Sequence, residues 1–214
     1  MDKIINIKNL PKEIPIFPLS DCLLMPKGTI SLNIFEPRYI NMTEDAISNN
    51  RYIGMIQPRH KHNNEPELYP TGCVGKITHF SELKDQKYLI ELTGVCRFQL
   101  ISHKLTERKY RIASIDLANY SQDLKDNKLE LNPLLKDSFL NSLKNYFESQ
   151  KIDADWQIIE KAPTNVLINS LAQSCPFNKE EKQKLLESTD LDDLINTMIT
   201  LFKIYSAGET NNLN

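Results

Sequence analysis

The segment from Ile14 to Tyr39 constrains the fold more than any other, because it sets four prolines and one glycine between short apolar runs. Proline has a fixed φ and no backbone N–H, so the first three of these prolines restrict strands to short pieces at sheet edges or strand beginnings. Between them, residues 29–35 alternate between polar and apolar side chains. The alternation predicts a half-buried strand, and Pro37 suits the first turn of a helix that follows it.

The composition bounds the protein class. The chain has 214 residues, of which 40% are hydrophobic and 25% are charged, enough for one large domain or two small ones with proper cores. A net charge of −2 argues against a nucleic-acid partner held by bulk electrostatics. No secretory signal is recognisable, and no apolar run reaches the roughly 18 residues that a membrane helix requires. We therefore expect a cytoplasmic protein with no membrane partner.

The cysteines and histidines do not indicate a metal site. The four cysteines are widely separated and none forms a CxxC pair, so we expect small buried apolar side chains and no cofactor. His60 and His62 could share one side of a strand, but their polar, proline-bounded setting over residues 58–66 favours a solvated surface loop.

The region up to residue 118 reads as a series of strands. Short apolar or alternating runs predict strands at 51–57, 68–83, 88–93, 95–102 and 110–117. Gly72 and Gly75 lie inside the longest of these, where glycine usually marks a bulge or a bend. Five or six twisted strands of this kind predict a small closed or nearly closed sheet, which also removes exposed edges.

The remainder of the chain reads as helical. A polar linker over 119–131 precedes Asn132 and Pro133, a cap and first position that start a helix. Asn178 and Glu181 have the spacing of a capping box. Further helices are expected over 153–161, from residue 163 or 164, with Val166 and Leu171 inward, and from 190, with a frayed tail at 207–214.

Several of these motifs together resemble one known family, the N-terminal substrate-binding domain of Lon proteases. In chain order they are Pro15-Ile-Phe-Pro-Leu19, Pro26-Lys-Gly28, Leu32-Asn-Ile-Phe-Glu-Pro-Arg-Tyr39, Leu92-Thr-Gly-Val-Cys-Arg-Phe98, Leu167-Ile-Asn-Ser-Leu-Ala172, Cys175-Pro-Phe177 and Glu181-Lys-Gln-Lys-Leu-Leu-Glu187. The resemblance spans about residues 12–206 in the family's order.

The resemblance implies an α+β fold, with an N-terminal PUA-like mixed β-barrel over 12–118 and a C-terminal α-helical bundle over 132–206. The ATPase and Ser-Lys peptidase modules of Lon would follow this region, and the chain contains no phosphate-binding G-x-x-x-x-G-K-[ST] motif. We therefore expect a stand-alone, non-enzymatic module that binds polypeptides and is linked to protein quality control or proteolysis. Its expected partners are unfolded or tagged clients, with Lon protease as a further candidate.

Candidate peptide contacts lie in the proline-bounded loops and at two arginines. They are Leu23, Met25, Phe35, Arg38, Tyr39 and Arg97. The apolar members could equally belong to the core. The arginines could line a peptide groove, or they could bind carbonyls and carboxylates across the barrel, which we favour.

Two rival functions come from other classes. RNA binding through the PUA-like barrel would use the cluster Arg108-Lys109-x-Arg111, although three basic residues in a turn are usually a solvated surface. An enzyme with a small-molecule pocket between the two halves would need ionisable groups that converge in a cleft.

Overall fold

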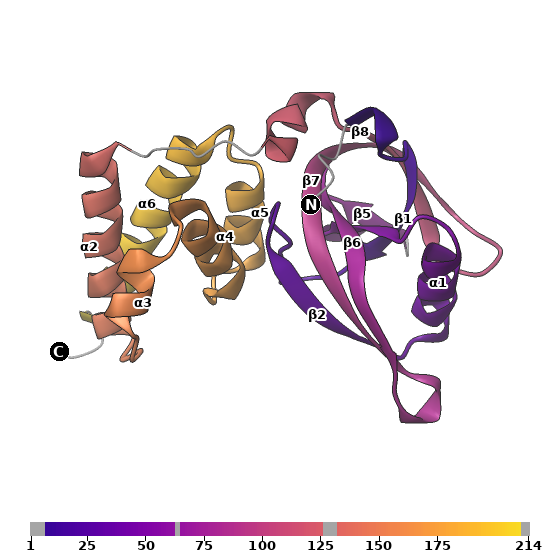
Figure 1. Cartoon of the computed structure of the whole chain (residues 1–214), viewed down its shortest axis with the longest axis horizontal. Helices are drawn as coiled ribbons and strands as arrows, with labels where there is room; N and C mark the ends of the chain where they lie inside the picture. Colours follow the sequence, from indigo (N-terminus) through magenta and orange to yellow (C-terminus); the bar gives the residue numbers. More distant parts are fainter. Residues whose placement is uncertain (1–6, 63–64, 126–131, 211–214) are drawn as a thin grey trace. The chain divides into compact units, whose positions relative to one another are not determined.

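The computed structural model describes residues 7–62, 65–125 and 132–210, which form two compact units. The first unit comprises the chain up to residue 126 together with residues 176–186, and the second comprises 127–175 and 187–214. Figure 1 shows strands in the first unit and helices in the second. The expected α+β class is confirmed.

The first unit contains eight described strands, two α-helices and three short 3₁₀ helices. In chain order these are Ile7–Asn9 (3₁₀), β1 (Glu13–Pro18), β2 (Thr29–Ile34), α1 (Pro37–Ser48), β3 (Tyr52–Ile56), β4 (Pro58–His62), β5 (Glu65–Leu68), β6 (Thr71–Glu82), Lys84–Gln86 (3₁₀), β7 (Tyr88–Leu105), β8 (Arg111–Asp116), Ala118–Leu124 (3₁₀) and α5 (Lys179–Leu186).

The main sheet closes into a barrel. Its strand order is β2-β7-β6-β3-β1-β8, and β8 pairs again with β7, so that β7, β6, β3, β1 and β8 form a ring. The β1–β3 pair is parallel and the other pairs are antiparallel, as a mixed barrel requires. Ring closure depends on β7, which has 18 residues, because its first part pairs with β2 and its last part with β8. The two strands expected at 88–93 and 95–102 are therefore one.

The barrel interior is apolar and tightly packed. Phe98 on β7 is fully buried, and a Cβ atom at Gly72 on β6 would lie 2.4 Å from the Phe98 ring, so no larger residue fits there. The cluster around Phe98 includes Ile14, Ile16, Val74, Cys96, Ala113 and Ile115. The register shift between Val74 and Gly75 confirms the expected bulge.

Helix α5 belongs to the barrel unit rather than to the helices expected over 132–206. Its Gln183 amide donates to the Thr71 carbonyl (3.1 Å), and the Gln57 amide donates to the Gln183 side-chain oxygen (3.1 Å). Lys182 Nζ donates to the Asp21 carbonyl (2.8 Å). The side chains of Gln57, Lys182 and Gln183 are buried, so these hydrogen bonds satisfy polar groups that water cannot reach and thereby stabilise the contact of α5 with the barrel.

Three further local expectations need correction. Residues 58–66, expected as a surface loop, contribute to the two-stranded β4–β5 sheet, while the side chains of His60 and His62 lie outside the described part. The linker expected over 119–131 begins as the 3₁₀ helix Ala118–Leu124, whereas residues 126–131 lie outside the description. The tail expected from residue 207 continues α6 to Thr210, and residues 211–214 are not described.

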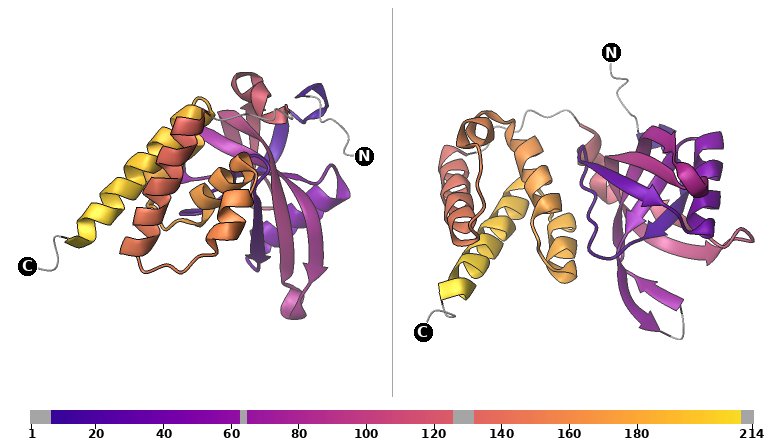
Figure 2. Two further views of the ribbon diagram at one scale, coloured as in Figure 1. Left: turned by 60° about the vertical axis from the view of Figure 1, so that its left-hand side comes forward. Right: turned by 90° about the horizontal axis from the view of Figure 1, so that it is seen from below.

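The second unit consists of α2 (Pro133–Ser149), α3 (Trp156–Lys161), α4 (Thr164–Ser174) and α6 (Leu191–Thr210), drawn from two further directions in Figure 2. Asn132 caps α2 as predicted, accepting a hydrogen bond from Leu134 N–H (3.0 Å). Helices α2 and α6 pack through aromatic rings, with Tyr146 stacked on Phe202 at 5.0 Å between centroids. Within the described residues, no helix combines the length and apolarity needed to cross a membrane.

Candidate functional site

Strand β2 lies at the free border of the main sheet and is the candidate polypeptide-binding site. It pairs with β7 from Thr29↔Thr93 to Ile34↔Tyr88 and has no strand on its other side among the described residues. Its even-numbered residues point into the core, and Ser31 and Asn33 are exposed. Figure 1 shows β2 with the long strand β7, whose hairpin with β6 extends past the rest of the sheet.

A tight turn at residues 25–28 positions β2 against β7. Gly28 N–H donates to the Met25 carbonyl (2.9 Å), Lys27 N–H donates to the Gly94 carbonyl (2.8 Å), and Gly94 N–H donates to the Gly28 carbonyl (2.8 Å). Lys27 adopts a φ of 64°, in the left-handed region that such turns require. Two of the sequence motifs, Pro26-Lys-Gly28 and Gly94-x-x-Arg97, therefore meet at the start of the border strand.

Exposed apolar side chains occur at the end of the sheet where β2 ends. Phe35 follows the strand directly and is 63% exposed, and at the same end of the sheet Leu83 and Phe80 are 43% and 36% exposed. The Phe80 ring also lies 5.0 Å from Tyr88. Phe35, which adjoins the border strand, provides apolar contact area for an extended polypeptide.

The six residues predicted from sequence separate into two groups. Phe35 and Arg38 are exposed, and Arg38 pairs with Glu36 (2.8 Å) while lying over the Tyr39 ring (4.4 Å). The other four are buried and present no side-chain surface in this structure. They are Leu23, Met25, Tyr39 and Arg97. The first three pack in the core because the loop after β1 and the helix α1 each turn one apolar side inward.

Arg97 has the structural role that we favoured from sequence. Its guanidinium makes two bonds to the Asp123 carboxylate (2.8 and 2.9 Å) and one to the Leu186 carbonyl (3.2 Å), and it lies 4.6 Å from the centre of the Tyr120 ring. Burial works to lower the pKa of Arg97, but the hydrogen bond and charge of Asp123 outweigh it and raise the pKa. Arg97 thus joins β7, the 3₁₀ helix after β8 and α5. No local pattern indicates a role for Asp123, which lies in the expected linker.

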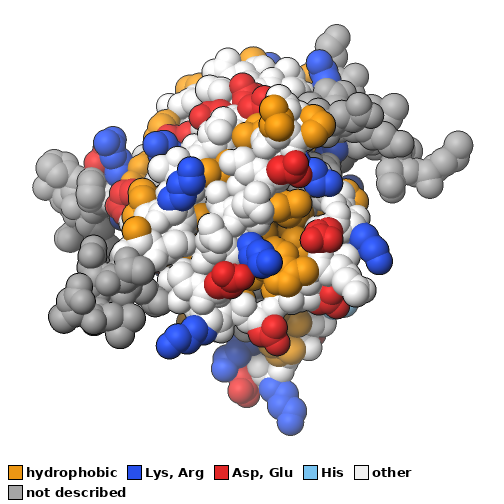
Figure 3. Space-filling model, turned by 90° about the vertical axis from the view of Figure 1, so that its left-hand side faces the viewer, with side chains coloured by type: hydrophobic (Ala, Val, Ile, Leu, Met, Phe, Trp, Pro, Cys, Tyr) orange, Lys and Arg blue, Asp and Glu red, His pale blue; other side chains and the backbone are white. Residues whose placement is uncertain are grey.

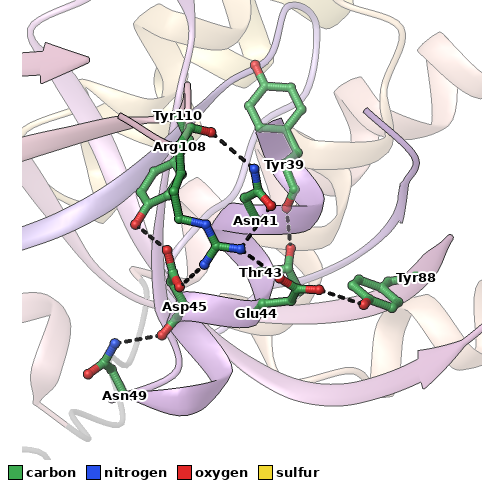
Figure 4. A network of polar contacts seen from close by, with 9 residues as sticks. All are labelled: Tyr39, Asn41, Thr43, Glu44, Asp45, Asn49, Tyr88, Arg108 and Tyr110. Atoms are coloured by element: carbon green, nitrogen blue, oxygen red, sulfur yellow. Dashed lines mark hydrogen bonds and ion pairs between the residues drawn. The ribbon is translucent and has the colours of Figure 1, made fainter. Parts of the chain in front are cut away.

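Within the basic cluster, Arg108 is paired with α1, as Figure 4 shows. Arg108 bonds to Glu44 (2.8 Å), Asp45 and Asn41 (2.9 Å), and Tyr110 Oη donates to Asp45 (2.7 Å). These contacts connect α1 to the β7–β8 turn. A paired charge of this kind attracts phosphate weakly, so Arg108 does not favour RNA binding.

The helical unit also exposes apolar side chains. Figure 3 shows a face of the molecule on which hydrophobic side chains lie between charged ones. The exposed large apolar residues of this unit are Leu134, Ile152, Ile158, Val166 and Ile204. Val166, expected to point inward, is therefore an exposed position of α4.

The described residues contain no group of three or more His, Cys, Asp or Glu side chains arranged to hold a metal ion. Two exposed apolar residues near this end of the sheet, Phe80 and Leu83, were not among the peptide contacts predicted from the sequence, which favours an inward Phe80. Leu83 stands directly before the polar turn 84–87, and that position was the available signal.

Comparisons with known proteins agree with this architecture. The family model of the ATP-dependent protease La (LON) substrate-binding domain matches residues 13–203. The chain is 22% identical to Lon protease 2 of Myxococcus xanthus over 191 residues, and 25% identical to the Lon protease of Dictyoglomus thermophilum over 200 residues. These matches cover 88% and 87% of this chain, which spans only 23% and 24% of the two relatives.

Two solved structures share the fold. A Lon N-terminal domain protein from Xanthomonas campestris matches with a TM-score of 0.60 and 20% identity, over 89% of this chain and 97% of that one. The N-terminal domain of a Mycobacterium avium complex Lon protease matches with a TM-score of 0.60 and 13% identity, over 92% and 98%. The family match extends from β1 into α6, so the chain belongs to the Lon substrate-binding domain family.

Proposed function

We propose that this chain is a non-catalytic module that binds exposed apolar segments of unfolded or tagged polypeptides and thereby takes part in protein quality control. The observation that carries the proposal is the family match over residues 13–203 to a substrate-binding domain. The free border of β2, with Phe35 exposed beside it, supports the proposal by supplying a surface suited to such a ligand.

The binding test uses reduced, carboxymethylated α-lactalbumin with a fluorescent label, titrated with the purified chain and followed by anisotropy. We expect saturable binding at micromolar concentrations and none to native α-lactalbumin. Absence of binding to the unfolded protein would refute the proposal. A labelled single-stranded RNA serves as the rival ligand, and RNA binding that falls steeply with added salt would favour the RNA function instead.

A matched pair of variants locates the surface. Phe35 and Ile101 are both 63% exposed, but only Phe35 adjoins β2. Phe35→Ala should weaken binding about tenfold, since about 1.4 kcal/mol is within what burial of a phenylalanine side chain contributes. Ile101→Ala should leave affinity unchanged, and equal losses in the two variants would exclude β2 as the location.

We propose Lon protease as a partner and the cytoplasm as the compartment. Supporting the partner, the relatives named above are Lon proteases. Supporting the compartment, the four cysteines, all within the described residues, form no disulfide, as is usual where the environment is reducing. The test adds the purified chain to a Lon protease that is degrading an unfolded client. A changed degradation rate supports the partnership, and an unchanged rate at saturating concentration opposes it.

A further inference from the structure

The outer border of β2 presents backbone hydrogen-bonding groups that no described strand uses. Gly94 N–H donates to the Gly28 carbonyl just before the strand, so the backbone groups of Gly94 on β7 face β2. The even-numbered residues of β7 that follow the same parity, Leu92, Ile90 and Tyr88, pair with Ile30, Leu32 and Ile34. In an antiparallel pair, hydrogen-bonded and non-hydrogen-bonded positions alternate. The even-numbered residues of β2 therefore turn their backbone groups to β7, and Ser31 and Asn33 turn theirs outward.

Nothing in the described part of the chain satisfies these outward groups. Ser31 and Asn33 are exposed, and neither makes a hydrogen bond with any described residue on the outer side. An extended backbone is the ligand that matches a row of alternating N–H and C=O groups, because its own groups recur with the same repeat.

The β2 border also lacks the features that keep strand borders from pairing with other chains. Such features are charged side chains, prolines and bulges. The segment Thr29–Ile34 contains no charged residue and no proline, and its pairing with β7 shows no register shift.

The other described borders carry these features. The small β4–β5 sheet contains Pro58, Pro66 and several charged residues. The part of β6 that extends past its pairing with β3 has a register shift after Ile77 and carries the charged residue Glu82. The part of β7 beyond Gln99 carries Lys104 and has a register shift after Leu100. Protection is thus missing at the one border that adjoins the exposed Phe35.

We propose that the outer border of β2 binds an extended client segment as an added β-strand, through the backbone groups of Ser31 and Asn33. This inference rests on the proposed function and specifies its mode. Because backbone groups make the bonds, recognition depends weakly on client sequence and requires only an extended segment with apolar side chains for the surface around Phe35. Six residues of β2 offer about 20 Å of border, enough for one short segment.

The first test probes the ligand backbone and leaves the protein unchanged. The probe is a fluorescent peptide of alternating valine and threonine with a lysine at each end, together with two versions that are N-methylated at either the odd or the even positions. An added strand turns every second N–H toward β2, so one version should bind at least tenfold more weakly and the other should match the parent. Equal binding by both versions, or equal loss, overturns the inference.

The second test removes one outward donor from the protein. Ser31→Pro deletes an N–H that no described residue accepts, and proline is tolerated on border strands. We expect at least fivefold weaker binding, whereas the control Ser31→Ala, which retains the N–H, should bind as the parent does. Unchanged binding by a folded Ser31→Pro variant overturns the inference.

The outcomes separate this inference from the proposed function. If unfolded α-lactalbumin binds but the unmodified peptide does not, strand addition is wrong and polypeptide binding stands. If neither binds, both are wrong.

Discussion

Replacing Gly94 with alanine should destabilise the barrel unit severely. A Cβ atom at this position would lie 2.0 Å from the Met25 carbonyl oxygen, closer than real Cβ contacts allow. Since that oxygen belongs to the backbone of the 25–28 turn, no side-chain rotation can relieve the clash. Either the turn or β7 must move, and the bonds of Gly94 to Lys27 and Gly28 weaken together.

The expected cost of Gly94→Ala follows from two contributions. Overpacking of a tight site costs about 1–3 kcal/mol, and two weakened hydrogen bonds cost about 0.5–1.5 kcal/mol each, so we expect about 2–6 kcal/mol. That is a large part of the roughly 5–15 kcal/mol by which domains are stable. The control is Gly54→Ala, whose Cβ would meet the side-chain atoms Ile14 Cδ1 at 2.8 Å and Ile16 Cγ2 at 3.0 Å. Methyl groups can shift, so this variant should cost at least about 1 kcal/mol less.

The assay is urea denaturation followed by far-UV circular dichroism for the parent and both variants. A loss below about 1 kcal/mol for Gly94→Ala would refute the close-approach argument. So would a larger loss for Gly54→Ala than for Gly94→Ala. Trp156, the only tryptophan, lies in the helical unit, and its fluorescence gives a separate reading of that unit in the same samples.

Three other predictions concern buried polar groups. Arg97→Met leaves the Asp123 carboxylate buried without its charge partner, and it should lower the unfolding free energy measured by urea denaturation by about 3–5 kcal/mol. The double variant Arg97→Met/Asp123→Leu should recover most of that loss. If the double variant shows no recovery, the ion-pair argument is contradicted. Iodoacetamide should label Cys22, which is partly exposed, before it labels the three buried cysteines, and peptide mass mapping follows the order. Labelling of a buried cysteine before Cys22 would contradict the burial of these side chains. Burial, with the Asp123 charge, raises the pKa of Cys96 from 9.0 to about 12, so the folded state retains a proton that the unfolded chain loses. Its contribution to stability is complete below pH 9.0 and is lost as pH rises toward 12. Cys96→Ala should therefore reduce the fall in unfolding free energy between about pH 8 and about pH 10 by about 1 kcal/mol, and an unchanged fall would contradict this.

Local patterns were sufficient where one element determines its own geometry. The alternation at residues 29–35 predicts β2, Asn132 with Pro133 predicts the start of α2, and both bonds of the Asn178–Glu181 capping box are present (2.8 and 2.9 Å). In each case the residues that decide the structure are within a few positions of one another, so their spacing is visible in the sequence.

Local patterns were not sufficient where distant segments share one bond network. Asp123 appears as an ordinary linker carboxylate until Arg97, 26 positions earlier, meets it in the fold. Similarly, α5 has a helical pattern, but only its bonds to Gln57 and Thr71 assign it to the barrel unit. The same limit applies to the candidate site. Phe35 is exposed and Met25 is buried, and neither residue type nor spacing in the sequence distinguishes the two.

The sequence by itself determined the family and most element types, because proline and glycine positions, side-chain periodicity and capping residues act over a few neighbouring positions. Only the tertiary structure decided which surface is available. Within the described residues, the pairing of β7 with β2, β6 and β8 closes the ring and leaves β2 with a strand on one side only. This outcome depends on strands far apart in the chain satisfying one another's backbone groups, so no local pattern could have placed the outward groups of Ser31 and Asn33 at a free border.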